Sequence, residues 1–449
     1  MPATTPETLK RVLKPIHLWG IAVGLVISGE YFGWNFGWGV AGTIGFLIAT
    51  LIITVMYITF VFSYTELTTA IPHAGGAFAY AYRAMGPFGG LIAGYATLVD
   101  FLFATPAIAA ALGAYLHFLY PSIPVIPSAI CFNIVFMLLN ISGVKESAAF
   151  SVFITILAVA ELLLFMGIVA PHFKMSNYLS HPMPFGWGGV FAALPFAVWF
   201  YLAIEGVAMV AEEVKDPKRN IPMGYISGLA TLIFLALGVM ILTGGITDWR
   251  NLSTVLDPLP ESISIALGKT NSLTKAFAGI GLFGLIASLH GTVLASSRQV
   301  YAMARSGYLP GFLSRLNHRF KTPYWAIIVG GLISFIALCV DNTAEYIVIL
   351  SAMGAVFMYM MSMISLFILR KKEPTLDRPF ASPFYPVFPA VALIISAVSL
   401  FAIIYYHFQL SLIFFGALAV AIFIFVVMGK HKVKITNDAM LEETVLVSP

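Results

Sequence analysis

Charged residues are scarce in this sequence. Asp, Glu, Lys and Arg make up 10% of its 449 residues, hydrophobic residues make up 60%, and the mean hydropathy is +0.93. In soluble domains about a quarter of the residues are charged. This scarcity excludes an ordinary soluble globular protein and leaves no basic surface for nucleic acid. It predicts a polytopic membrane protein whose main surroundings are the lipid bilayer.

Cysteine is almost absent, and its two occurrences, Cys131 and Cys339, lie in separate apolar runs. This excludes a disulfide framework, and no metal-ligand spacing is visible, so we expect neither a metal nor a cofactor. No nucleophile–base constellation and no HExxH-type motif is present, so an enzyme is not expected. A cleavable signal peptide is not evident either, because a polar tail runs to Lys14 and the apolar segment that follows exceeds signal length.

Long apolar segments recur along the whole chain. A helix needs about 20 apolar residues to cross a bilayer, and twelve segments approach or exceed this length. The predicted fold class is therefore an all-α polytopic membrane protein with twelve transmembrane helices. The expected spans are residues 16–38, 41–68, 88–118, 124–142, 147–170, 189–212, 223–246, 272–303, 323–341, 344–369, 385–406 and 409–429.

Basic residues are unevenly shared between the loops. With the N-terminus in the cytoplasm, only Lys174, Arg250, Lys269 and Lys275 of the 24 Lys and Arg residues lie outside, and the other 20 lie inside. This asymmetry fits the positive-inside rule. It predicts cytoplasmic termini in a plasma membrane, the inner membrane of a bacterium.

The outer loop after the seventh expected span, residues 247–271, is the longest outer loop. It carries Asp248, Asp257 and Glu261. We expect it to contain a short helix that covers a site.

Lysine and arginine are missing from the middle of every expected span, but four acids lie there: Glu30, Asp100, Glu161 and Glu205. An ionised carboxylate at that depth costs about 2.5–3.5 kcal/mol on insertion scales. Four carboxylates without a basic partner favour a cation pathway or a proton relay. The alternative is that each is protonated, or hydrogen-bonded to neighbouring helices, and serves packing only. His290 in the eighth span is a further proton-shuttle candidate, although a lone histidine is more often structural.

Glu30 follows Ser28-Gly29, a poor helix sequence, and precedes a run of aromatic residues that begins at Tyr31. A carboxylate surrounded by aromatic faces suits an ammonium group, through charge pairing and cation–π contacts. The alternative, most fitting for Trp38, is that the rings form an interfacial belt or face lipid. Irregular backbone at membrane depth is tolerated only where it lines a cavity or contacts protein.

Glu205 lies in a second segment that favours a helix break, because the small residues Ala203 and Gly206 flank it. The two interrupted segments are the first and sixth spans. Corresponding interrupted helices in two halves indicate a transporter binding site built from inverted repeats. An offset of five spans inverts the second repeat relative to the first, as that architecture requires.

Three motifs resemble the permeases of the amino acid–polyamine–organocation superfamily. They are Ser63-Tyr-Thr-Glu-Leu through Pro72-His-Ala-Gly-Gly-Ala-Phe-Ala-Tyr80, Ala211-Glu-Glu-Val-Lys-Asp-Pro-Lys-Arg-Asn-Ile-Pro222, and Ser296-Ser-Arg-Gln-Val-Tyr-Ala-Met-Ala-Arg-Ser-Gly-Tyr-Leu-Pro310. The resemblance covers all twelve spans and implies secondary transport by alternating access. It also implies a LeuT-like five-plus-five inverted repeat with two extra helices. The expected parts are a tail (1–15), the two repeats (16–170 and 189–370), the extra helices (385–429) and a second tail (430–449).

One departure from the family pattern concerns the substrate. Amino acid members of the family have a Gly-Ser/Thr-Gly break in the first span, and its backbone N–H groups hold the substrate carboxylate. Here Glu30 replaces the last glycine, and a carboxylate there would repel such a substrate. The run Ser28-Gly-Glu-Tyr-Phe-Gly-Trp-Asn35 resembles the ethanolamine permeases. This implies an organic amine such as ethanolamine, with choline as a near relative.

The expected substrate-binding residues come from the first, third and sixth spans. They are Ile27, Ser28, Gly29, Glu30, Tyr31, Asp100, Trp199, Phe200, Tyr201, Ala203 and Glu205. By resemblance to arginine/agmatine antiporters, Trp199 matches an aromatic gate residue and Glu205 a proton-sensing acid. The expected proton-coupling residues are Glu205, Glu161 and His290.

Several alternatives stay open at this point. Other family members carry a coupling lysine in the fifth span, and this chain has none there, so the coupling ion and the choice between symport and exchange are undecided. An amino acid permease that uses Glu30 only structurally is the main alternative function. An amine sensor without transport is a second alternative, against which the small share of soluble sequence argues. The sequence does not indicate an oligomeric state.

Overall fold

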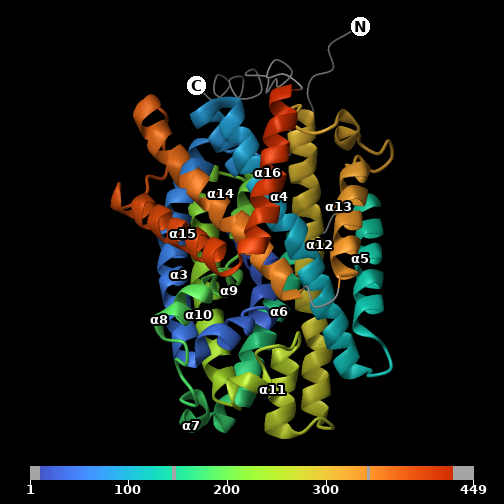
Figure 1. The fold of residues 1–449 in the computed structure, drawn as a ribbon. Helices are drawn as coiled ribbons and strands as arrows, with labels where there is room; N and C mark the ends of the chain where they lie inside the picture. Colours follow the sequence, from blue (N-terminus) through green and yellow to red (C-terminus); the bar gives the residue numbers. More distant parts are fainter. Residues whose placement is uncertain (1–10, 144–147, 341–343, 428–449) are drawn as a thin grey trace.

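The computed structural model describes residues 11–143, 148–340 and 344–427, and this part of the chain is built of helices without any β-strand (Figure 1). The C-terminal tail predicted at 430–449 and most of the N-terminal tail lie outside the described residues. Nine helical segments of the described part are long and apolar enough to cross a membrane. The all-helical, multi-pass fold class is therefore confirmed.

The nine membrane-length segments agree with nine of the expected spans. They are Phe36–Ala70 (α3), Ala77–Leu119 (α4), Phe150–His172 (most of α6, Ala148–Val169, with η1, Ala170–His172), Leu194–Glu213 (α9, Leu194–Trp199, with η2, Ile204–Glu213), Pro217–Gly244 (α10), Ser272–Arg305 (α12), Ala344–Lys372 (α14), Val387–Tyr406 (α15) and Phe408–Val427 (α16).

Shorter helices complete the described part. Two of them, α5 and α13, are apolar and coincide with the fourth and ninth expected spans. The total of twelve spans remains a prediction. The shorter elements are α1 (Pro15–Val26), α2 (Ser28–Tyr31), α5 (Val125–Ile141), α7 (Met175–Tyr178), α8 (Gly186–Ala192), η3 (Trp249–Asn251), α11 (Pro258–Leu267), η4 (Gly311–Ser314) and α13 (Tyr324–Leu338).

Two predicted span boundaries coincide with kinks rather than loops. The first two expected spans meet near residues 39–40, and α3 bends close by at Gly42, whose φ is 69°. The third expected span begins at 88, just after α4 bends at Gly86, whose φ is 75°, but the helical segment from Ala77 to this bend was not predicted. Glycine adopts positive φ without a steric penalty, so a helix can change direction there without a loop.

The first membrane segment is interrupted, as its sequence predicts. Helix α1 ends at Val26, and α2 makes a single turn before the backbone becomes extended at Phe32. Gly33 then takes a φ of 89°. The hydroxyl of Ser288 on α12 donates a hydrogen bond of 2.8 Å to the Leu25 carbonyl at the end of α1. This side chain satisfies a backbone group that the break would otherwise leave unpaired.

The sixth segment is interrupted too. Helix α9 ends at Trp199, Ala203 has left-handed backbone with a φ of 77°, and the 3₁₀ helix η2 follows. The predicted break beside Glu205 is therefore present. Left-handed backbone is strained for alanine, and such strain concentrates where the surrounding packing holds it for a function.

The two interruptions pack directly against each other. The Trp199 indole donates a 2.9 Å hydrogen bond to the Phe32 carbonyl. A Cβ at Gly29 would lie 2.4 Å from the Trp199 carbonyl oxygen, and a Cβ at Gly33 would lie 2.5 Å from the Trp199 indole nitrogen. Only glycine at both positions allows this approach, so the local sequence fixes where the broken segments meet.

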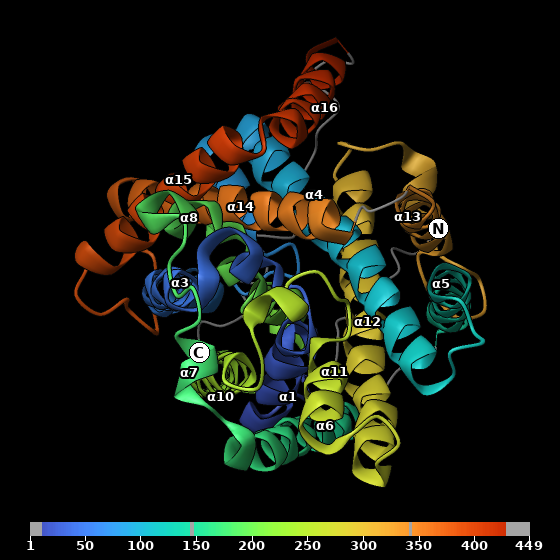
Figure 2. The same cartoon turned by 60° about the horizontal axis from the view of Figure 1, so that its bottom comes forward.

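At one end of the molecule, α11 lies over α6 and α12 (Figure 2). The short helix predicted in the long loop is therefore present. The amide of Asn35 donates hydrogen bonds of 2.7 and 2.9 Å to the carbonyls of Leu252 and Val255 in this loop. The covering loop is thus tied to the chain just after the first break.

At the opposite end, the buried carboxylate of Glu66 on α3 is held by two guanidinium groups. Arg370 of α14 donates two hydrogen bonds of 2.7 Å to it, and Arg378 lies 3.2 Å away. The backbone N–H of Ser382 donates a further bond of 2.7 Å. Sequence analysis quoted Glu66 within a motif without identifying these partners.

We expect Gly29→Ala to destabilise the protein, because the added Cβ overlaps the backbone of the sixth segment. Overpacking of this kind costs about 1–3 kcal/mol. Thermal unfolding of the purified protein in detergent measures the effect. The matched control is Gly279→Ala on α12, where a Cβ meets nothing within 4 Å. Equal melting temperatures of both variants and wild type would contradict the close contact.

Candidate functional site

The four acids predicted inside the membrane are buried in the structure. Their exposed fractions are 0% for Glu30 and Asp100, 3% for Glu161 and 1% for Glu205. None of them takes part in a salt bridge among the described residues, and no Lys or Arg of that part of the chain is buried. A buried carboxylate without a cation must bind a proton, a ligand cation or strong donors.

Glu30 is the least satisfied of these acids. Neither of its carboxylate oxygens has a hydrogen-bond partner among the described residues. Its backbone carbonyl accepts a 3.1 Å bond from the indole of Trp34. The Trp34 ring stacks on Phe200, with centroids 5.5 Å apart at an angle of 18°.

These rings do not form an interfacial belt. Tyr31, Trp34 and Trp38 are all 0% exposed, so the belt interpretation considered for Trp38 is wrong. Trp34 and Trp38 pack edge to face at 4.7 Å. After the break the rings pack on the sixth segment, where Trp34 stacks on Phe200 and Phe36 packs edge to face against Phe196.

Asp100 on α4 and Glu205 on η2 form a carboxyl pair close enough to interact electrostatically. Tyr359 of α14 donates a 3.1 Å bond to Glu205 Oε2, and Ser351 donates a 3.2 Å bond to Asp100 Oδ1. Asp100 Oδ2 and Glu205 Oε1 have no hydrogen-bond partner in the described part of the chain. Two neighbouring carboxylates in a buried site are not both ionised without a cation, so the pair needs a proton or a cation.

A small cavity lies beside the two breaks and has room for about one water molecule. Four of the predicted substrate-binding residues line it. A larger substrate therefore requires the surrounding side chains to separate. The lining residues are Leu25, Val26, Ser28, Gly29, Ala104, Ile108, Trp199, Leu202, Ala203 and Thr292.

The other predicted substrate-binding residues do not line this cavity. Ile27 is buried between α1 and α2. Phe200 and Tyr201 form the turn of the sixth segment, and the Tyr201 hydroxyl lies 2.8 Å from that of Thr54 on α3. The breaks thus bring residues of the first, third and sixth segments together.

The proton-coupling candidates lie in three different places. Glu205 is paired with Asp100, whereas Glu161 accepts a 2.6 Å bond from the Tyr31 hydroxyl. His290 of α12 faces α5, where its Nδ1 lies 3.1 Å from the Asn140 amide nitrogen. The structure therefore brings Glu161 next to the first break and gives His290 a separate polar contact between helices.

Sequence analysis missed several hydroxyl groups of the site. Tyr57 and Tyr359 lie 2.9 Å apart through their hydroxyls, and Tyr359 reaches Glu205. Ser288 donates a 2.7 Å bond to the Ser28 hydroxyl. The only available signal was the four-residue spacing of Ser288 and Thr292, which places both on one face of α12; nothing in the sequence indicated which segment they contact.

Comparison with known proteins identifies the family. The amino acid permease family model matches residues 13–441. The chain belongs to this family. It is thus a membrane permease of the amino acid–polyamine–organocation superfamily and not an enzyme.

The relatives of this permease differ in their names. An uncharacterized transporter of Rhizobium meliloti is 31% identical over 422 residues, which cover 89% of each chain. The methylthioribose transporter of Bacillus subtilis is 30% identical over 358 residues, covering 74% of this chain and 75% of the relative. The branched-chain amino acid permease BcaP of the same organism is 24% identical over 420 residues, covering 87% and 88%. Membership of the family therefore leaves the substrate open.

Asp257 precedes α11 in the covering loop, outside the membrane segments. Burial raises the pKa of Asp257 to about 6, and the nearby Glu261 carboxylate adds to the rise. Its ordinary value is 3.8. Between pH 4 and pH 6 the folded protein therefore keeps the proton of Asp257, which the unfolded chain loses. The free energy of unfolding falls as the pH rises through this range.

We expect Asp257→Asn to be more stable than wild type near pH 8, by at most about 3 kcal/mol, and equally stable near pH 4. Thermal unfolding at both pH values measures this. Asp248→Asn is the control, and its effect on stability should have the opposite sign. Hydrogen bonds from Arg250 and Ser180 outweigh burial and lower the pKa of Asp248, so the ionised carboxylate stabilises the folded protein and the variant loses this contribution near pH 8. A pH-independent effect of Asp257→Asn would contradict the assignment.

Proposed function

We propose that this permease is a secondary active transporter of a small organic amine cation, with ethanolamine as the first candidate and choline as the second. The observation that carries the proposal is the complete burial of the Glu30 carboxylate without a partner for either oxygen. A site that holds an uncompensated negative charge has a strong preference for a cation.

The surroundings of Glu30 suit an ammonium group rather than a metal ion. The Trp34 indole donates to the Glu30 backbone carbonyl and stacks on Phe200 of the other interrupted segment, and aromatic faces attract organic cations. Among the described residues no group of three or more His, Cys, Asp or Glu side chains is arranged to hold a metal. An amino acid would bring its own carboxylate next to Glu30, and the repulsion disfavours it.

The transport cycle we propose uses the two interruptions as the moving centre of an inverted-repeat fold. The repeats are residues 16–170 and 189–370, followed by the helices at 385–429, twelve spans in all. The amine enters from the α11 face, which is the outer face if both termini are cytoplasmic in the plasma membrane. It loses its water beside Glu30, and Trp199 and Tyr201 close over it. Binding neutralises the carboxylate and lowers the cost of the closed state.

Proton coupling fits a proton held by the Asp100–Glu205 pair. If the amine contacts this pair, it displaces the proton, and the proton returns when the amine leaves. This supports exchange or proton-linked transport with Glu205 as a coupling residue. Glu161 and His290 are the remaining coupling candidates.

An amino acid permease of the same superfamily is the second candidate function. It is favoured by the name of the branched-chain amino acid permease BcaP, a relative of similar length. In that case Glu30 stays protonated and serves packing. The two functions differ in the competitors that block transport.

We expect Glu30→Gln to weaken ethanolamine uptake into proteoliposomes, because the variant loses the charge but keeps the size of the side chain. A charge-assisted hydrogen bond contributes about 1.5–3 kcal/mol, so the apparent affinity should fall about 10- to 100-fold. Radiolabelled ethanolamine is the probe, with unlabelled choline and alanine as competitors. Glu345→Gln, which changes an acid at the start of α14 that is not part of the proposed site, is the matched control.

Glu30→Asp adds a second test, since it keeps the charge and should retain more uptake than Glu30→Gln. Inhibition by choline but not by alanine would support the amine proposal. Full ethanolamine affinity in Glu30→Gln, or uptake blocked by alanine, would favour the amino acid permease and assign Glu30 to packing.

A further inference from the structure

The connection between α12 and α13 carries positive charge and no negative charge. We call residues 305–325 the basic segment; it runs from the last residue of α12 to the second residue of α13 and includes η4. No Asp or Glu occurs in the sequence between Glu261 and Asp341, so the basic segment has no acid of its own. Its four cations are Arg305, Arg315, Arg319 and Lys321.

These four cations are exposed, and none of them forms a salt bridge with the residues that the structure describes. By contrast, Arg83, Arg370 and Lys218 each have a carboxylate oxygen within 3.0 Å. A cation that no protein carboxylate neutralises is available to an external anion, and Arg in particular binds phosphate through two parallel N–H donors.

A hydrogen-bonded turn holds the backbone between the cations. The side-chain oxygen of Asn317 accepts bonds of 2.9 and 3.2 Å from the backbone N–H groups of Arg319 and Phe320. Its backbone accepts a 2.9 Å bond from Lys321 and donates a 2.8 Å bond to the Thr322 carbonyl. Lys321 has left-handed backbone with a φ of 56°, a strained conformation for a residue with a side chain. The turn therefore has a defined structure that keeps Arg319 and Lys321 on the surface.

The basic segment is attached to membrane helices on both sides. The Thr322 hydroxyl donates a 2.8 Å bond to the carbonyl of Ile141, the last residue of α5. The Tyr308 hydroxyl donates a 2.7 Å bond to the Pro87 carbonyl of α4, and its ring stacks on Phe425 of α16 at 5.5 Å. Because α4, α12 and α16 are of membrane length, these contacts hold the segment beside the membrane surface.

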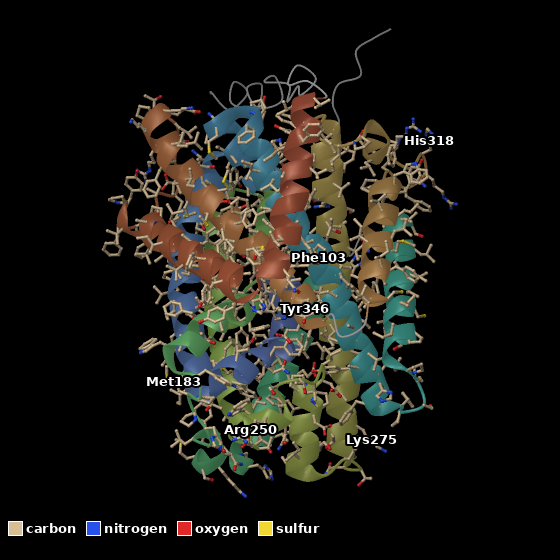
Figure 3. The ribbon with its side chains drawn as sticks, in the orientation of Figure 1. Phe103, Met183, Arg250, Lys275, His318 and Tyr346 are labelled. Atoms are coloured by element: carbon tan, nitrogen blue, oxygen red, sulfur yellow. The ribbon has the colours of Figure 1, made fainter. Side chains whose placement is uncertain are left out.

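This surface lies at the end of the molecule opposite the covering loop. Figure 3 shows His318, in the middle of the basic segment, far from Arg250 and Lys275 at the other end. The distribution of Lys and Arg predicts that the His318 end is cytoplasmic. Anionic lipids of the cytoplasmic leaflet attract basic segments that adjoin membrane helices.

Aromatic rings lie between the cations of the basic segment. Phe312, Phe320 and Trp325 are 42%, 38% and 36% exposed. The guanidinium carbon of Arg319 lies 5.1 Å from the centroid of the Phe320 ring, and Phe312 packs edge to face against Trp325 at 5.8 Å. Exposed rings beside cations are typical of the boundary between lipid headgroups and acyl chains, whereas a soluble anion has no use for them.

We propose that the basic segment binds the headgroups of anionic phospholipids in the surrounding bilayer. Its cations contact the phosphate groups, and Phe312, Phe320 and Trp325 lie at the level where the headgroups meet the acyl chains. A lipid held there joins the end of α12 to the ends of α5 and α13. The lipid site lies outside the proposed transport path, so it does not depend on the identity of the substrate.

Native mass spectrometry of the purified protein, titrated with phosphatidylglycerol or with phosphatidylcholine, counts bound lipids without any transport substrate. Wild type should bind phosphatidylglycerol more tightly. Each Lys or Arg near an anionic lipid surface contributes about fivefold in affinity. The triple variant Arg315→Gln/Arg319→Gln/Lys321→Gln should therefore weaken the tightest phosphatidylglycerol site by about 100-fold.

The matched control is Lys215→Gln/Lys218→Gln/Arg219→Gln, which removes three exposed cations from the connection between η2 and α10 and should keep the wild-type affinity. Equal phosphatidylglycerol affinity in the two triple variants would overturn the proposal. Melting temperatures without added lipid show whether each variant is folded. If the first triple variant does not fold, Arg319→Gln alone should lose about fivefold, and Arg319→Lys, which keeps the charge, should lose less.

A further comparison separates a lipid from a soluble phosphate ligand. Phe320→Ala should weaken phosphatidylglycerol binding, because the ring contacts the boundary of the acyl chains, and inorganic phosphate at millimolar concentration should not displace the lipid. Displacement by inorganic phosphate, together with an unchanged lipid affinity in Phe320→Ala, would overturn the lipid site and assign the basic segment to a soluble anion.

Discussion

Negative charge buried without a positive partner is the constraint on which this structure depends. Of five buried acids in the described part of the chain, only Glu66 is held by arginines. The other four lie where the first, third, fifth and sixth segments approach one another. In a medium of low dielectric constant each is stable only with a proton, a cation or strong hydrogen-bond donors.

The interruptions of the first and sixth segments follow from this constraint. A continuous helix pairs its backbone N–H and C=O groups with each other, so only its side chains are available to a ligand. A broken helix also leaves carbonyl groups free to bind a cation. The structure limits the cost of the breaks with particular partners, such as Ser288 for the Leu25 carbonyl and Trp199 for the Phe32 carbonyl. The left-handed Ala203 shows that some strain remains beside Glu205.

Much of this arrangement could be predicted from the sequence, because its signals are local. The lengths of the apolar runs predicted the membrane segments, and Ser28-Gly29 predicted the first break. The absence of lysine and arginine from the middle of the spans identified the four acids as candidates for a site. The boundaries near residues 40 and 88 were predicted, but not that kinks at Gly42 and Gly86 take the place of loops there, because a glycine in an apolar run does not reveal its backbone angles. The pairing of Asp100 with Glu205, and of Glu161 with Tyr31, depends on how distant helices rotate against each other. No periodicity within one segment determines that rotation.

The two hydrogen bonds from Asn35 to the covering loop have a consequence for how the loop moves. The loop cannot lift from the α11 end without either losing both bonds or drawing the chain after the first break along with it. A motion of the loop that keeps both bonds therefore also moves the segment that follows Glu30. In the proposed transport cycle, this ties the opening of the α11 end to the geometry of the first break.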